Sequence, residues 1–300
     1  MKRPNLLEEL AIRPLCCDGA MGTQLLARGL ASGDCGMLWN VDRSADIRAV
    51  HDAYHRAGCE LITSNSFGGS ASVLDPHGLA DRVVELNRAA ARIACDAAGK
   101  SGWVLGDVGP FGGFLEPLGE MTEDELEGIF RKQIEGLLEG GAHAVLVETM
   151  SDPAEAAVGV KAAKSCDPMV PVIVTYAFQK TASGEFRTMM GTGVEDAVQS
   201  ALEAGAQVVG ANCGTSLDLD DYVELAKLIV AGANGAHVII QPNAGAPRLE
   251  AERAVYDATP GQMAATAVRL LAAGVRIVGG CCGTSPEHLS AMSAAIKKSS

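Results

Sequence analysis

The sequence predicts an α/β protein with a single (β/α)8 TIM barrel, and three observations predict it. The chain has 300 residues, and a barrel of this type occupies about 250. Eight short runs rich in Val and Ile alternate with Ala-rich stretches of helical character. The runs are continuously apolar rather than alternating, which is typical of parallel strands covered by helices on both faces.

No stretch rich in Pro, Ser or charge divides the chain, so we expect one domain over residues 1–300, with residues 1–12 as a short helical lead-in. A doubly wound open sheet is the alternative. Eight consecutive strand–helix units without a long insertion favour closure into a barrel. The expected strands are Leu15–Ala20, Leu61–Ser66, Val104–Pro110, Ala144–Met150, Val172–Phe178, Val208–Cys213, Val238–Gly245 and Ile277–Gly283.

The stretches between the strands carry helix start and stop signals. Thr122 and Glu125 have the spacing of a capping box, and Asp152 precedes a proline at the first helical position. Thr259 and Ser285 also stand directly before a proline. Glycines a few residues before a strand are expected to end four helices. These glycines are Gly58, Gly141, Gly205 and Gly274.

Composition excludes several classes of function. The formal net charge is −13, and no stripe of Lys and Arg is available to neutralise phosphates, so a nucleic-acid partner is not expected. The chain has no apolar segment of a secretory signal and none long enough to span a membrane. The nine Cys are therefore expected to be reduced thiols or metal ligands in a cytoplasmic protein.

Three of these thiols follow predicted strands. Active sites of such barrels lie at the carboxyl ends of the strands, so closure would bring Cys213 to the same mouth as Cys281 and Cys282. Three thiolates suit Zn²⁺, which takes four tetrahedral ligands. Adjacent residues on a regular strand point to opposite faces, and the glycines around Cys281 and Cys282 would relax that constraint. The alternative is that all three are buried, small apolar residues.

Carboxylates also follow predicted strands. Asp18 and Glu148 end the first and fourth strands, where together they would bind an ammonium group. Ordinary ion pairing or helix capping is the alternative for each. Asp107, at the third strand, is expected only to brace a neighbouring loop. None of the six His falls at a strand end, which argues against a His-based hydrolase.

Several of these segments resemble the homocysteine S-methyltransferase family, in the family's order from Leu15 to the C-terminus. The likeness is greatest to the homocysteine-binding barrel of cobalamin-dependent methionine synthases. Gly279–Gly283 together with the upstream Asn212 and Cys213 is highly specific for the family. The segments that carry the resemblance are Asp18–Thr23, Asn65–Gly68, Gly210–Cys213, Pro242–Gly245 and Gly279–His288.

The resemblance implies roles for individual residues. It implies that Cys213, Cys281 and Cys282 ligate a catalytic zinc and that the oxygen of Asn243 is the fourth ligand before substrate binds. It further implies that zinc holds the thiol of homocysteine as a thiolate, which takes a methyl group to give methionine. The residues implied to bind substrate are Asp18, Gly19, Ser64, Glu148 and Asn212.

The methyl donor is less specified. Members most similar to this chain take the methyl group from methylcobalamin or another methylcorrinoid, so we expect a corrinoid carried by another domain or protein. Betaine-using members typically have an aromatic residue after the strand-two Phe67, where this chain has Gly68. S-methylmethionine or betaine as donor, without a corrinoid, is the alternative. A non-enzymatic zinc or redox-sensing protein, in which Cys281 and Cys282 oxidise reversibly, is the alternative of another class.

Overall fold

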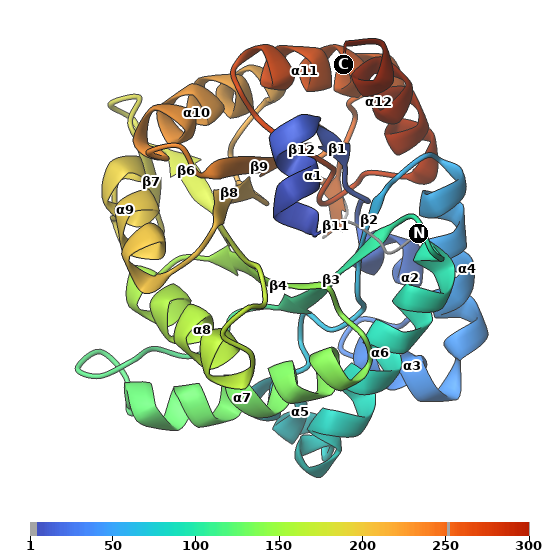
Figure 1. Ribbon diagram of the computed structural model, residues 1–300, viewed down its shortest axis with the longest axis vertical. Helices are drawn as coiled ribbons and strands as arrows, with labels where there is room; N and C mark the ends of the chain where they lie inside the picture. The colour runs from blue at the N-terminus through green and yellow to red at the C-terminus, as the bar shows by residue number, and fades with distance from the viewer. Residues whose placement is uncertain (1–4, 251–252, 300) are drawn as a thin grey trace.

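A computed structural model describes residues 5–250 and 253–299 (Figure 1). Its central sheet has eight parallel strands in the order β1-β12-β9-β8-β5-β4-β3-β2. A parallel bridge between Cys17 and Leu61 joins the two outer strands, and the Asp18 amide donates to the Leu61 carbonyl at 3.0 Å. The sheet is therefore a closed barrel, as predicted. The strands are β1 (Leu15–Cys16), β2 (Leu61–Thr63), β3 (Trp103–Val108), β4 (Ala144–Met150), β5 (Val172–Tyr176), β8 (Val208–Asn212), β9 (His237–Gln241) and β12 (Ile277–Val278).

Helices surround the barrel, and their ends follow the predicted signals. Thr122 with Glu125, and Thr259 with Gln262, form capping boxes. Gly141 and the three other glycines predicted to end helices all have positive φ, the conformation that favours glycine. The outer helices are α2 (Met21–Ala27), α3 (Trp39–Asp42), α4 (Ser44–Arg56), α5 (Ala71–Leu74), α6 (Val83–Ala98), α7 (Glu123–Glu139), α8 (Pro153–Cys166), α9 (Val194–Ala204), α10 (Leu219–Gly232), α11 (Pro260–Ala272) and α12 (Pro286–Ser299). Short 3-10 turns occupy Gly36–Leu38, Asp75–His77 and Ala80–Arg82.

A further helix, α1 (Leu6–Ile12), lies across the amino-terminal end of the barrel and appears inside the ring of helices in Figure 1. Its buried Leu6 and Leu10 pack in one apolar cluster with inward-facing strand residues such as Leu105 and Leu146. The predicted lead-in is thus a helical floor over residues 6–12. Residues 1–4 of the predicted segment lie outside the described residues.

Two antiparallel hairpins interrupt the predicted series of strand–helix units. The first, β6 (Phe178–Lys180) with β7 (Phe186–Thr188), lies between β5 and α9. The second, β10 (Arg248–Glu250) with β11 (Arg253–Val255), lies between β9 and α11. The expectation of strand–helix units without a long insertion was therefore wrong at these two places. The hairpins could not be recognised from the sequence because each of their strands is only three residues long.

Several strands end earlier than the apolar runs suggest. The last strand stops at Val278, so Gly279–Gly283 belong to the loop at the carboxyl end of the barrel. Likewise β2 stops at Thr63 and β9 at Gln241. The polar residues beyond these ends form the rim of the barrel mouth. Within the described residues, no helix is long and apolar enough to cross a membrane.

Candidate metal centre and substrate pocket

The three predicted metal ligands come together at the barrel mouth. Cys213 follows β8, Cys281 and Cys282 follow β12, and their sulfur atoms all lie within 4.8 Å of one another. The sulfurs of Cys213 and Cys282 are 3.6 Å apart. The backbone of Cys213 has a φ of 51°, which is rare for a residue other than glycine. The adjacent cysteines converge because they lie in a loop, where strand alternation does not apply.

Two asparagines flank the thiols. Asn243 donates through Nδ2 to the Gly214 carbonyl at 2.9 Å, and its buried Oδ1 has no hydrogen-bond partner among the described residues. Asn212 donates through Nδ2 to Thr149 Oγ1 at 2.7 Å and to the Cys281 sulfur at 3.7 Å. A buried oxygen without a partner costs about 1–3 kcal/mol. The free oxygen of Asn243 is therefore well suited to receive a cation.

The protonation of the thiols is shared among them. Hydrogen bonds from the thiols of Cys213 and Cys281 lower the pKa of Cys282. Hydrogen bonds and burial raise the pKa of Cys281. One thiolate supported by two thiols and an amide oxygen is a soft donor set of the kind that Zn²⁺ accepts. The residues present therefore fit the implied metal.

Two tyrosines at the centre were not predicted from the sequence. The Tyr222 hydroxyl accepts a hydrogen bond from the Gly214 amide at 2.8 Å. The Tyr256 hydroxyl is hydrogen-bonded to Cys282. Its ring lies so close to Gly283 that a Cβ there would be 2.3 Å from the Tyr256 Cγ. Tyr256 follows the second hairpin, so only a prediction of that hairpin would have indicated its place.

Acidic side chains line the other side of the mouth. Both oxygens of Asp18 accept hydrogen bonds from Thr63, at 2.9 Å from its amide and 2.8 Å from its hydroxyl. Burial raises the pKa of Asp18 to about 7. Burial, followed by the negative charges of Asp18 and Cys282, raises the pKa of Glu148 to about 8. No Lys, Arg or His in the described part of the chain forms an ion pair with either carboxylate.

The other predicted substrate residues have clear structural contacts. A Cβ on Gly19 would lie 2.5 Å from Thr284 Oγ1 and 2.8 Å from a methyl carbon of Leu289, so only glycine fits there. The Ser64 hydroxyl is buried, 2.7 Å from the Ser66 hydroxyl and 3.1 Å from the Asp107 amide. Gly19 and Ser64 therefore fix the loops that carry the acidic side chains.

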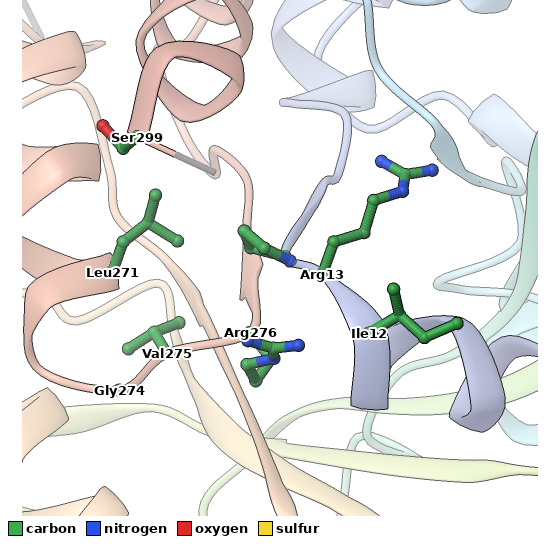
Figure 2. Close-up of a pocket in the computed structure, with 8 residues that line it drawn as sticks. Ile12, Arg13, Leu271, Gly274, Val275, Arg276 and Ser299 are labelled. Carbon is green, nitrogen blue, oxygen red and sulfur yellow. The ribbon is translucent and has the colours of Figure 1, made fainter.

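A separate pocket of about 480 Å³ lies at the opposite, amino-terminal end of the barrel (Figure 2). Arg13 in its wall pairs with Glu9 and Glu60, and Arg276 donates to the Leu10 carbonyl. The charged groups of this pocket are thus already bound within the protein. Among the described residues, the side chains at the mouth that have a buried oxygen without a partner include Asp107, Asn212 and Asn243, and other buried polar atoms without partners lie on outer helices such as α4 and α7.

Comparison with known proteins agrees with this geometry. The sequence profile of the homocysteine S-methyltransferase family matches residues 15–296. The chain is 31% identical to a methionine synthase from Mycobacterium leprae (strain TN) over 98% of its own length, which covers 25% of that protein. It is 30% identical to a methionine synthase from Mycobacterium tuberculosis (strain ATCC 25618 / H37Rv), with coverages of 97% and 25%. The chain thus spans about a quarter of the length of these relatives.

Solved structures show the same fold. The metallated form of the homocysteine methyltransferase MmuM from Escherichia coli gives a TM-score of 0.78 at 24% identity, covering 97% of this chain and 99% of that chain. A methyltransferase from Methanosarcina mazei gives a TM-score of 0.63 at 11% identity, with coverages of 98% and 97%. With the family profile matched over nearly the whole sequence, the chain belongs to the homocysteine S-methyltransferase family.

Proposed function

We propose that this chain is a zinc-dependent S-methyltransferase that methylates the thiol of homocysteine to give methionine. One observation carries the proposal. A cluster of three thiols within 4.8 Å shares the barrel mouth with carboxylates that have no cationic partner among the described residues. Homocysteine has the complementary groups, a thiol and an ammonium, in a single small molecule.

In this proposal Cys213, Cys281 and Cys282 would hold the zinc, and the oxygen of Asn243 would be the fourth ligand in the substrate-free protein. Bound zinc supplies the positive charge that keeps the substrate thiol ionised at neutral pH. Tyr256 and Asn212 restrain the sulfurs of Cys282 and Cys281 through the hydrogen bonds described above.

Asp18 and Glu148 accept hydrogen bonds from the ammonium group of the substrate. A cation next to these buried carboxyls favours their ionised forms, which burial alone disfavours. Gly19 and Ser64 contribute indirectly, because their contacts hold in place the loops that carry the acidic side chains. The thiol and the ammonium are thereby held at two separate points, which orients the sulfur toward the open end of the barrel.

We propose a methylcorrinoid such as methylcobalamin, carried by another domain or protein, as the methyl donor. Support comes from the methionine synthases, which extend well beyond the length matched by this chain. The exposed apolar side chains Phe67, Phe114 and Leu118 follow β2 and β3 at the rim and offer contact to a large donor. The alternative is a small donor such as S-methylmethionine or betaine, which would need no corrinoid, and the fold shared with the homocysteine methyltransferase MmuM is compatible with either donor.

The test is methionine formation from homocysteine by the zinc-loaded protein. Methylcobalamin, S-methylmethionine, betaine and methyltetrahydrofolate are compared as donors. Cys282→Ser is the inactive blank, and Cys166→Ser on α8 is the matched thiol control. Turnover with methylcobalamin supports the corrinoid branch, whereas turnover only with S-methylmethionine or betaine supports the other. Protein that holds one zinc, yet neither binds homocysteine nor methylates it with any donor, would contradict the proposal and favour the redox-sensing alternative.

A further inference from the structure

Asp107 lies inside the barrel, on the floor of the mouth. It is 3% exposed, and it follows Leu105 by two residues on β3. Leu105 belongs to the apolar cluster that fills the barrel, whereas Val104 and Val108 belong to the cluster between the strands and the outer helices. Side chains two apart on a strand share a face, so the Asp107 carboxyl points into the barrel.

The hydrogen bonds around Asp107 fix its backbone and leave part of its carboxyl free. The Asp107 amide donates to Ser64 Oγ at 3.1 Å. The Asp107 carbonyl accepts from Ser66 Oγ at 2.7 Å and from Gln133 Nε2 at 3.2 Å. The Val108 amide hydrogen-bonds to the carboxyl, but Oδ1 has no partner among the described residues. The expected bracing of a loop therefore runs through the Asp107 backbone rather than its side chain.

The groups that face Asp107 are acidic. Burial, then the charges of Glu148 and Asp18, raise the pKa of its carboxyl. None of these three carboxylates pairs with a Lys, Arg or His in the described residues. Gln241 also faces the barrel interior, where its Nε2 contacts the Cys17 sulfur at 3.8 Å and its Oε1 has no partner among those residues. A space with several free acceptors and no cation is complementary to a group that only donates and carries positive charge.

We infer that the ammonium group of the substrate lies between Asp107 and Glu148, so that Asp107 is a third acidic contact for the amino acid. This inference rests on the proposed function of the same pocket and adds a residue that the sequence had assigned to the loop alone. An ammonium group has three N–H donors, one for each of Asp18, Glu148 and Asp107, and each Asp18 oxygen keeps acceptor capacity beside its single hydrogen bond from Thr63. Asp107 therefore makes the pocket selective for amino thiols over thiols without an amino group.

The test uses calorimetric titration of the zinc-loaded protein with two thiols. L-homocysteine carries the ammonium group, and 4-mercaptobutyrate is the same thiol acid without it. Asp107→Asn removes the charge at nearly constant volume. We expect its Kd for homocysteine to rise at least tenfold, a loss of about 1.4 kcal/mol, with the Kd for 4-mercaptobutyrate unchanged within about twofold.

The matched control is Glu155→Gln. Glu155 is also a buried carboxyl, and burial raises its pKa to about 7, but it lies on α8 and accepts from the Phe111 amide at 2.7 Å. This control is expected to change neither Kd. Zinc content and thermal unfolding establish that each variant is folded, and Asp107→Ser serves as a second variant should Asp107→Asn not fold. The unmodified protein provides a measurement that needs no variant, since it should bind homocysteine at least about 100-fold more tightly than 4-mercaptobutyrate.

Equal loss of affinity for both thiols in Asp107→Asn, or no loss for either, would overturn the role of Asp107. Equal binding of both thiols by the unmodified protein would overturn it as well, while leaving the thiol-binding zinc centre intact. Protein that holds zinc and binds neither thiol would instead overturn the proposed function, and the inference with it.

Discussion

The two ends of the barrel differ in how completely their buried polar groups are satisfied by hydrogen bonds. At the floor, Leu6 and Leu10 of α1 are 2% and 0% exposed, and the Leu10 carbonyl accepts from Arg276. At the mouth, the oxygens of Asn243 and Asp107 lack partners among the described residues, and Cys213 adopts a left-handed backbone. Unsatisfied groups and strained backbone cost stability and persist where they serve function. The floor therefore stabilises the fold, and the mouth carries the chemistry.

The largest effect that separates the two ends is expected for Cys282→Ser. Removing one of three thiolates should prevent zinc binding and reduce methionine formation at least about 1000-fold, equivalent to about 4 kcal/mol of transition-state stabilisation. Stability of the metal-free protein should change by less than about 1 kcal/mol, because the thiols lie at the strained end. Metal content, turnover and denaturant unfolding are measured together, with Cys166→Ser as control. A large loss of metal-free stability would break the division between the ends.

Leu10→Ala is the reciprocal change at the floor. Removing a fully buried leucine from the interior cluster should lower the free energy of unfolding by about 2–4 kcal/mol. The KM for homocysteine should stay within about twofold, since the mouth lies at the opposite end. Urea unfolding and steady-state kinetics at a permissive temperature measure both quantities. Exposed Ile12→Ala, on the same helix, is the control and should change neither. A change in KM for Leu10→Ala without loss of stability would be the contrary result.

Glu148→Gln sharpens the comparison within the mouth. Loss of one charge from the ammonium site should raise the KM for homocysteine about tenfold, close to 1.4 kcal/mol. Zinc content should remain at the level of the unmodified protein, because Glu148 is not among the proposed ligands. Initial rates over a range of homocysteine concentrations, together with metal analysis, measure this. An unchanged KM would remove Glu148 from the substrate site.

The same variant carries a smaller effect on stability that depends on pH. Because the folded-state pKa of Glu148 is raised to about 8, the folded protein binds its proton more tightly than the unfolded chain does. The contribution of Glu148 to the free energy of unfolding is fully present below the pKa that its carboxyl has in the unfolded chain. It is lost as the pH rises through the pKa that the carboxyl has in the folded protein. Allowing for solvent in the mouth, Glu148→Gln should be more stable than the unmodified metal-free protein by on the order of 1 kcal/mol at pH 8, and by almost nothing at pH 4.5.

Denaturant unfolding at both pH values, in the presence of a chelator, measures this difference. The difference between the two proteins is the useful quantity, since the lowered pKa of Cys282 acts on total stability in the opposite direction. A stability gain that is larger at pH 4.5 than at pH 8 would contradict the raised pKa.

The sequence was sufficient for the barrel because its strands are continuously apolar and its helices carry capping residues. The first hairpin was missed because two of the three residues of its strand β6, Gln179 and Lys180, are exposed, so the strand has no apolar run in the sequence. The three thiols could be grouped because strand ends meet at one rim. The hydrogen bonds from Asn212 to Thr149 and Cys281 could not be predicted, since they depend on side-chain placement across β4, β8 and β12 after closure.

The helical floor also restricts the order of events. With α1 packed across the floor, the proposed substrate site opens at the mouth, and Asp107, buried at 3% exposure, lies below the rim where the proposed donor would approach. The reactant that lies deeper must therefore enter first, and its product must leave last. In the proposed reaction, the steady-state kinetics should therefore be ordered and sequential, with homocysteine binding first.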